Sequence, residues 1–374
     1  MVNTPMIKQL LEREPTGKPV LSLYLDMSVG SDNKRSHLLF LNKQRAALAA
    51  SGANVDRSAR PAAGELFDRI ERWLDSAYLE RNRGVAIFAE LGGDFFQTVQ
   101  LPRPLPNCMV LQERPLVAPL AEVLENERRW AILLVDRESM QLISAFLDQV
   151  EAEQVIAPEA LPAHHDVQGG GYSQKDHQKR KAEETRHFFK QFAEAVVRFQ
   201  QRHRPEGYAV LGTAENVKHF REFLPQPVRA RVVHTGTVPT HLSASELVQH
   251  LAPTFRNVLE RREAEAVQAL LERVRTAHYA TSGFHDTLTQ LQEGKVDTLI
   301  ISRDAEHDGV QCTQCGFTMV RRDGACPFCG GELRDGVDLV ESMIRMAAQQ
   351  DARVEFVSGP PMDQVNGVGA LLRF

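Results

Sequence analysis

The chain has 374 residues, of which 43% are hydrophobic and 25% charged, and its formal net charge at pH 7 is -5. This length predicts two or three domains with full hydrophobic cores, and the composition is typical of a soluble globular protein. The negative charge argues against a protein that coats nucleic acid generally, although a local basic surface can still contact RNA. The longest apolar runs, such as Trp130–Val135, are far too short to span a bilayer. The N-terminus has no basic segment with an apolar core behind it, so we expect a cytoplasmic protein.

Residues 1–125 are expected to form a first α/β domain. Val20–Leu25 alternates between the two faces that a half-buried strand presents. Two later apolar runs are joined through Gly92 and Gly93, which predicts a strand pair. The expected elements, in chain order, are a strand at 20–25, helices at 38–50 and 64–78, and strands at 84–89 and 95–101.

Residues 126–276 are expected to form a second α/β domain with a central sheet, because short apolar runs alternate with segments of helical spacing. Ser243 and Glu246 fit a capping box and therefore predict the start of a long helix. The expected elements are strands at 130–136, 141–146, 207–212 and 229–234, and helices at 173–198, 216–224 and 243–276.

Three successive glycines, Gly169 to Gly171, lead into the first of these helices. Glycines allow positive φ and close approach of the backbone to a partner. Ser173 and Asp176 fit another capping box, so Gln174 is expected in the first turn. At 100° per residue Lys175, Lys179 and Arg186 lie within an arc of roughly 40° beside an apolar stripe. The stripe consists of Ala182, Thr185, Phe189, Phe192, Val196 and Phe199.

Two interpretations of this segment stay open on spacing alone. The glycines and the basic arc suit a loop built for close contact with a partner. The same pattern also suits a surface loop that leads into an ordinary amphipathic helix.

Residues 277–374 predict a third domain, an α/β/α sandwich that is interrupted by a cysteine-rich insertion. The expected elements are helices at 285–293 and 338–350, and strands at 296–302, 353–357 and 368–374.

The insertion carries Cys312, Cys315, Cys326 and Cys329 in the pattern C-x2-C-x10-C-x2-C, whereas Cys108 stands alone. In a chain without export signals this spacing favours a metal over disulfides. Four thiolates complete a tetrahedral shell that suits zinc best, and no coordination position is left open. We therefore expect a structural zinc ribbon at 308–334. Free or redox-active cysteines are the alternative.

Four segments of the third domain carry a resemblance to a known family. They are Phe284-His-Asp-Thr-Leu, Gly294-Lys-Val-Asp-Thr-Leu-Ile-Ile, Val340-Glu-Ser-Met and the ending Gly367-Val-Gly-Ala-Leu-Leu-Arg-Phe. In these segments the domain resembles the C-terminal domain of archaeal and eukaryotic class I peptide release factors and of Pelota. The resemblance implies three α/β domains, of which the last is a ribosomal-protein-L7Ae-like sandwich. It also implies a monomer that binds the ribosome through rRNA and peptidyl-tRNA, with a translational GTPase as a further candidate partner.

The central domain also resembles that of release factors, in which a Gly-Gly-Gln loop opens a basic helix and its glutamine helps to place the water that attacks the peptidyl-tRNA ester. Here Tyr172 follows Gly170-Gly171, and the spacing becomes Gly171-x-x-Gln174, which is similar to the Vms1 group. The resemblance makes Gly170, Gly171 and Gln174 the candidate catalytic residues. The candidate RNA-binding residues are Tyr172, Lys175, Lys179, Arg180 and Arg186.

Two functions follow as hypotheses. The first is codon-independent peptidyl-tRNA hydrolysis in the rescue of stalled ribosomes. The second is a non-catalytic, Pelota-like factor for ribosome hibernation or splitting, which Tyr172 favours because it could stack on RNA. A ribosome-independent role in RNA binding or cleavage is a third class. Ordinary stop-codon decoding is not expected, because the N-terminal domain lacks the family's Asn-Ile-Lys-Ser and Tyr-x-Cys motifs and offers only Asp32–Ser36 as a faint echo.

Overall fold

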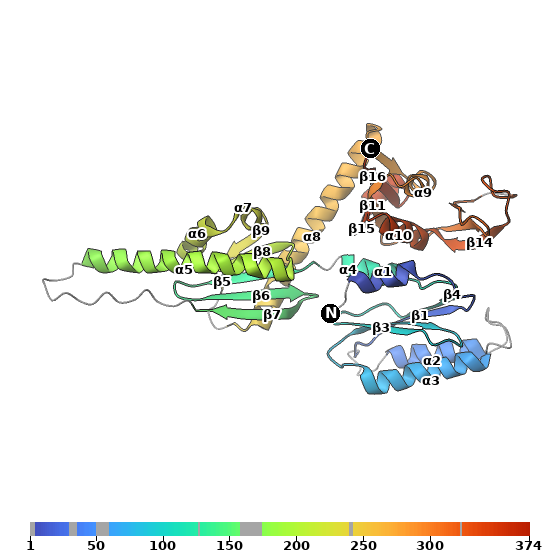
Figure 1. Cartoon of the computed structure of the whole chain (residues 1–374), viewed down its shortest axis with the longest axis horizontal. Helices are drawn as coiled ribbons and strands as arrows, with labels where there is room; N and C mark the ends of the chain where they lie inside the picture. Colours follow the sequence, from blue (N-terminus) through green and yellow to red (C-terminus); the bar gives the residue numbers. More distant parts are fainter. Residues whose placement is uncertain are drawn as a thin grey trace. The chain divides into compact units, whose positions relative to one another are not determined.

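The computed structural model describes residues 4–29, 36–49, 60–125, 128–157, 174–238, 242–321 and 324–374. The chain separates into two compact units, whose elements are labelled in Figure 1. Unit 1 combines Met1–Asn126 with Arg262–Phe374, and unit 2 is Glu127–Arg261. Both units contain mixed helices and sheets, which confirms a multi-domain α/β protein. The division at 125/126 and 276/277 stays a prediction.

The N-terminal part of unit 1 is an antiparallel sheet of order β3-β2-β1-β4, with α2 and α3 packed on one face. The predicted strand pair is confirmed, since Gly84 lies opposite Leu101 and Ala89 opposite Phe96. Neither α4 nor β4, the strand that begins at Cys108, was predicted from the sequence. The elements are α1 Thr4–Glu12, β1 Val20–Asp26, α2 Ser36–Ala49, α3 Arg60–Ala77, β2 Gly84–Glu90, β3 Phe96–Leu101, β4 Cys108–Gln112 and α4 Ala118–Glu125.

The C-terminal part of unit 1 is the predicted α/β/α sandwich. Its sheet has the order β10-β16-β11-β15, with β11 parallel to β15 and antiparallel to β16. Helices α9 and α10 pack on one face of this sheet, and η2 and the last turns of α8 (Ala244–Arg275) pack on the other. The elements are β10 Ala280–Ser282, α9 Phe284–Gln292, β11 Val296–Ser302, α10 Leu339–Gln349, β15 Arg353–Val357, η2 Pro360–Val365 and β16 Val368–Leu372.

A small second sheet of order β13-β12-β14 is inserted between β11 and α10. Its strands are β12 Asp308–Cys312, β13 Thr318–Met319 and β14 Leu333–Asp338. The strands are antiparallel, and Cys312 ends β12 opposite Leu333. The cysteine segment is therefore an insertion, as predicted, and the structure shows that it forms a sheet of its own.

Unit 2 is built on one sheet of order β7-β6-β5-β8-β9, in which β5, β8 and β9 are parallel. Helices α5, α6 and α7 bury apolar side chains against one face, and the first turns of α8 against the other. The elements are β5 Trp130–Val135, β6 Met140–Phe146, β7 Gln149–Ile156, α5 Gln174–His203, β8 Gly207–Gly212, α6 Ala214–Phe223, α7 Gln226–Arg229, β9 Val232–Gly236 and α8 Ala244–Arg275.

The strand predicted at 229–234 is wrong at its start. The short helix α7 occupies the preceding residues, with proline in its first positions, and β9 begins only at Val232. The fixed φ of Pro227 suits the first turn of a helix, and it shifts the strand toward the C-terminus.

The capping box at the start of α8 is confirmed by reciprocal hydrogen bonds. The backbone N–H of Ser243 donates to Glu246 Oε2 over 2.8 Å, and the backbone N–H of Glu246 donates to Ser243 Oγ over 3.3 Å. Each side chain satisfies an amide at the helix start that has no partner within the helix. Among the described helices, none combines the length and apolarity that crossing a membrane requires.

Candidate functional site: the cysteine cluster and helix α5

The two C-x-x-C segments of the insertion fold into matching knuckles. In the first, the N–H of Gly316 donates to Cys312 O over 3.0 Å, and in the second the N–H of Gly330 donates to Cys326 O over 2.9 Å. Gly316 and Gly330 have φ of 75° and 74°, a left-handed conformation that glycine adopts without strain. Each tight turn therefore presents its two cysteines to the same side.

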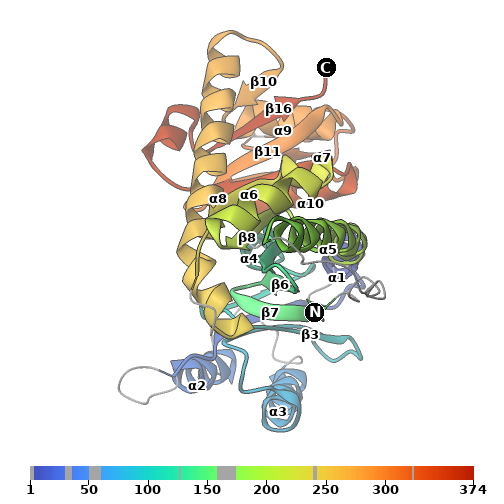
Figure 2. The same ribbon diagram turned by 90° about the vertical axis from the view of Figure 1, so that its left-hand side faces the viewer.

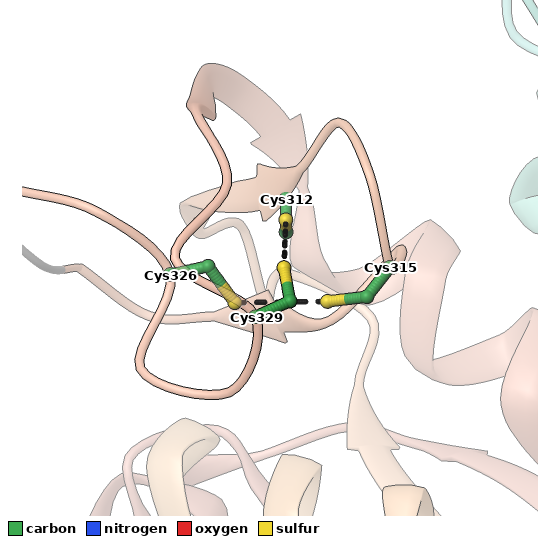
Figure 3. A group of neighbouring side chains, drawn as sticks. All are labelled: Cys312, Cys315, Cys326 and Cys329. Carbon is green, nitrogen blue, oxygen red and sulfur yellow. Dashed lines mark hydrogen bonds between the residues drawn. The ribbon is translucent and has the colours of Figure 1, made fainter.

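The four thiols meet between these knuckles, as Figure 3 shows. The Sγ atoms of Cys312 and Cys329 are 3.4 Å apart, and those of Cys315 and Cys326 are 3.6 Å apart. All four Sγ atoms lie within 4.8 Å of one another. A tetrahedral ion with bonds of about 2.3 Å to sulfur requires sulfur separations of about 3.8 Å. The cluster can therefore hold one metal ion.

The acidity of the thiols also differs within the cluster. The backbone N–H of Cys315 lowers the pKa of Cys312 to about 6. The backbone N–H of Gly331 lowers the pKa of Cys329, but hydrogen bonding to Cys312 and Cys315 outweighs it and raises the value to about 12. The four thiols cannot all ionise at neutral pH unless a cation compensates their charge.

The second candidate site is the glycine loop and the helix that follows it. Gly170, Gly171 and Tyr172 lie outside the described residues. Gln174 is the first residue of α5, which confirms the predicted helix to within one residue at this end. Lys175, Lys179 and Arg180 belong to the first two turns of α5, but their side chains lie outside the described part of the chain.

Helix α5 is anchored by its aromatic stripe. Phe189, Phe192, Val196 and Phe199 are buried in the core of unit 2, and the ring centroids of Phe189 and Phe220 are 5.5 Å apart. The stripe was predicted to begin at Ala182, but Ala182 is exposed. Figure 1 shows that the N-terminal end of α5 extends beyond the strands of its sheet, and Figure 2 views the helix from this end. The core therefore holds a helix whose first turns extend outward.

Arg186 is exposed and lines a cavity of about 1000 Å³ between α5, α6 and the turn after β5. Lys181, Glu184 and His219 share this lining. Arg137 also belongs to it and pairs with Glu215, with 3.3 Å between guanidinium and carboxylate. Neither Arg137 nor His219 was predicted from the sequence, because the turn after β5 and α6 come to lie beside α5 only in the folded unit. The lining of this cavity therefore contains both cationic and carboxylate side chains.

The comparisons with known proteins match both candidate sites. Residues 115–256 match the model of the family described as bacterial archaeo-eukaryotic release factor family 10. Residues 261–374 match the model of eRF1 domain 3. The chain belongs to the archaeo-eukaryotic release factor superfamily. In this superfamily member, the match over residues 115–256 includes the glycine loop and α5, and the match over residues 261–374 includes the cysteine insertion.

Curated relatives of this superfamily member extend along most of its length. It is 23% identical to peptide chain release factor subunit 1 of Methanocaldococcus jannaschii, over 99% of this chain and 96% of the relative. It is 25% identical to the same factor of Methanococcoides burtonii, over 69% of each chain.

Solved structures of two other proteins also align with this chain. The archaeal termination factor aRF1 is 15% identical over 99% of this chain and 96% of its own, with a TM-score of 0.26. Dom34 of S. cerevisiae is 10% identical over 75% of each chain, with a TM-score of 0.43.

Proposed function

We propose that this superfamily member binds the ribosome and hydrolyses peptidyl-tRNA independently of the codon, in the rescue of stalled ribosomes. The observation that carries the proposal is the position of Gln174, the first residue of a helix whose aromatic stripe is buried and whose first turns project from the sheet. Membership of a superfamily that includes peptide chain release factors supports the same function.

In this proposal each part of the loop has a separate role. The glycines Gly170 and Gly171 let the backbone approach the acceptor end of the tRNA closely. The amide of Gln174 orients the attacking water, and N–H groups at the start of α5 stabilise the oxyanion that forms. The rate gain then comes from positioning and from fixed dipoles, without a side chain that must transfer a proton.

The proposed basic contacts lie on the same helix. Lys175, Lys179, Arg180 and Arg186 would contact phosphates of rRNA or tRNA, with Tyr172 beside them. The proposed partners are the ribosome and its peptidyl-tRNA, with a translational GTPase as a delivery factor. We also propose that the protein acts as a monomer in the cytoplasm.

We propose zinc as the metal of the cysteine cluster, in a structural role. Four sulfur ligands at tetrahedral spacing favour zinc over metals that prefer oxygen, and they leave no position for a substrate. The described ribbon buries few apolar side chains, chiefly those of Val310, Cys312 and Cys326. A bound ion would therefore supply the core that the ribbon itself lacks.

The second candidate function is a non-catalytic factor that occupies a vacant ribosomal site. The observation in its favour is Tyr172, which stands where release factors have the loop glutamine. Sedimentation with stalled ribosome–nascent-chain complexes, combined with release of labelled peptide, separates the two functions. Binding with release supports the hydrolase, and binding without release supports the occupancy factor.

A further inference from the structure

A groove of about 560 Å³ in unit 2 lies between α6, α7 and the end of β9, and it shares only Glu222 with the cavity beside α5. It is lined by three cations and one carboxylate. The cations are Lys218, Arg221 and Arg229, and the carboxylate is Glu222. This local excess of positive charge contrasts with the net charge of -5 of the whole chain.

Helical spacing brings two of these cations to the groove. Ala214, Val217, Lys218 and Arg221 occur at intervals of three and four residues and therefore share one face of α6. Val217 on this face is buried in the core, which fixes the rotation of the helix. Lys218 and Arg221 are exposed. The core thus holds α6 with both cations turned to the groove.

Arg229 completes the cationic lining from α7. One of its terminal nitrogens, Nη2, donates to Glu222 O over 2.6 Å and to Leu224 O over 3.0 Å, at the C-terminal end of α6. These bonds hold the guanidinium in place, and its Nε and Nη1 groups remain available as donors. The exposed residues Thr235 and Thr237 add hydroxyl groups at the end of β9.

Lys218 and Arg221 have no carboxylate partner in the part of the chain that the structure describes. Arg137, in the neighbouring cavity, does pair with Glu215. Three cations and a single carboxylate on one concave surface leave a net positive charge, which indicates an anionic ligand. Guanidinium and ammonium groups together suit the oxygens of a phosphate.

We propose that this groove binds a phosphate group of an RNA backbone. RNA is favoured over a free nucleotide because none of the described lining residues is aromatic, and a base would have no ring to stack on. The exposed cations suit a phosphodiester that passes through the groove, which positions RNA without reading its sequence. The choice of RNA as the source of the phosphate rests on the proposed function.

The test measures binding of a fluorescent single-stranded RNA to the full-length protein by anisotropy, between 50 and 200 mM salt. The variant is Lys218→Gln with Arg221→Gln. Each lost phosphate contact reduces the slope of log affinity against log salt by about 0.7. Because the groove holds one phosphate, the wild type should lose about 2.6 times more affinity than the variant over this range. Arg256→Gln is the control, because Arg256 is an exposed cation on α8, which covers the other face of the sheet.

Equal salt slopes for the double variant and Arg256→Gln would overturn the proposal. Hydrogen exchange distinguishes an RNA phosphate from free inorganic phosphate as the ligand. Slower exchange in residues 214–237 when RNA is added supports RNA binding in the groove. Slower exchange with inorganic phosphate but not with RNA overturns the assignment to RNA.

Peptide release separates this inference from the proposed function. If the double variant has a changed salt slope but the wild type releases no peptide, the hydrolase proposal is wrong and RNA binding in the groove stands. If the wild type releases peptide but the double variant has an unchanged salt slope, only the proposal of RNA binding in the groove is wrong.

Discussion

At the scale of single residues, Glu341 and Arg345 join the two segments of unit 1. Glu341 Oε2 accepts from the backbone N–H groups of Val117 and Ala118 over 2.9 and 2.8 Å, and Oε1 accepts from Arg345 over 3.1 Å. Arg345 also donates to the carbonyls of Leu11 and Pro115. The exposed fractions of Glu341 and Arg345 are 6% and 8%. Burial raises the pKa of Glu341, and the charge of Arg345 opposes that rise.

We expect Glu341→Gln to destabilise unit 1 by about 3 kcal/mol, because it removes the carboxylate that is hydrogen-bonded to the buried guanidinium of Arg345. Trp73 lies in unit 1 and Trp130 in unit 2, so Trp73 fluorescence in a Trp130→Phe background reports the unfolding of unit 1 in denaturant. Glu306→Gln, at an exposed position of the same unit, should change the unfolding free energy by less than about 0.5 kcal/mol. Equal effects of the two substitutions would contradict this role of the pair.

The same contact explains why α4 could not be predicted from the sequence. No residue next to its start can cap it, since Leu116 and Val117 precede Ala118. Glu341, 224 positions beyond Val117, accepts the amides that a local cap would take. Tertiary contacts of this kind leave no local pattern. The cavity lined by Arg137 and His219 was missed for the same reason.

At the scale of elements, the helices and strands with a strong local sequence pattern were predicted well. The buried strands β1, β2, β5 and β11 are close to their expected ranges, and the helix after the glycine loop begins within one residue of the prediction. The cysteine spacing alone predicted the cluster of four thiols. The short strands β4 and β10 were not predicted, because neither has enough periodicity. Prolines lie close to both ends of β4, and β10 has only three residues.

The ribbon should depend on its metal. We expect about one zinc per chain, and we expect chelation to speed hydrogen exchange in residues 308–338 while the sandwich of β11, α9 and α10 stays protected. Cys326→Ser should lose the metal. Cys108→Ser should keep it, because Cys108 lies in β4, away from the cluster. Well under one zinc per chain in the purified wild type would contradict the assignment.

At the scale of the whole molecule, the two units differ in how their chain segments are connected. Unit 2 is one continuous segment with core side chains on both faces of its sheet. Unit 1 combines two segments that are far apart in the sequence and are joined by the contacts of Glu341 and Arg345.

Three fragments test this organisation. Residues 127–261 should fold alone, with a cooperative unfolding transition. Residues 1–126 and 262–374 should co-purify in equal amounts when they are expressed together, and Glu341→Gln should weaken their association. A folded 1–126 fragment that does not retain 262–374 would contradict the idea that unit 1 needs both segments.

The most direct test of the central claim is peptide release from stalled ribosome–nascent-chain complexes by the wild type and by Gln174→Ala. Gln178→Ala is the matched control, because it changes a second glutamine one turn further along α5. We predict that Gln174→Ala loses release while it still sediments with ribosomes, and that Gln178→Ala keeps both activities. Equal release by all three proteins would contradict the role of Gln174, and ribosome binding without peptide release by the wild type would contradict the hydrolase itself.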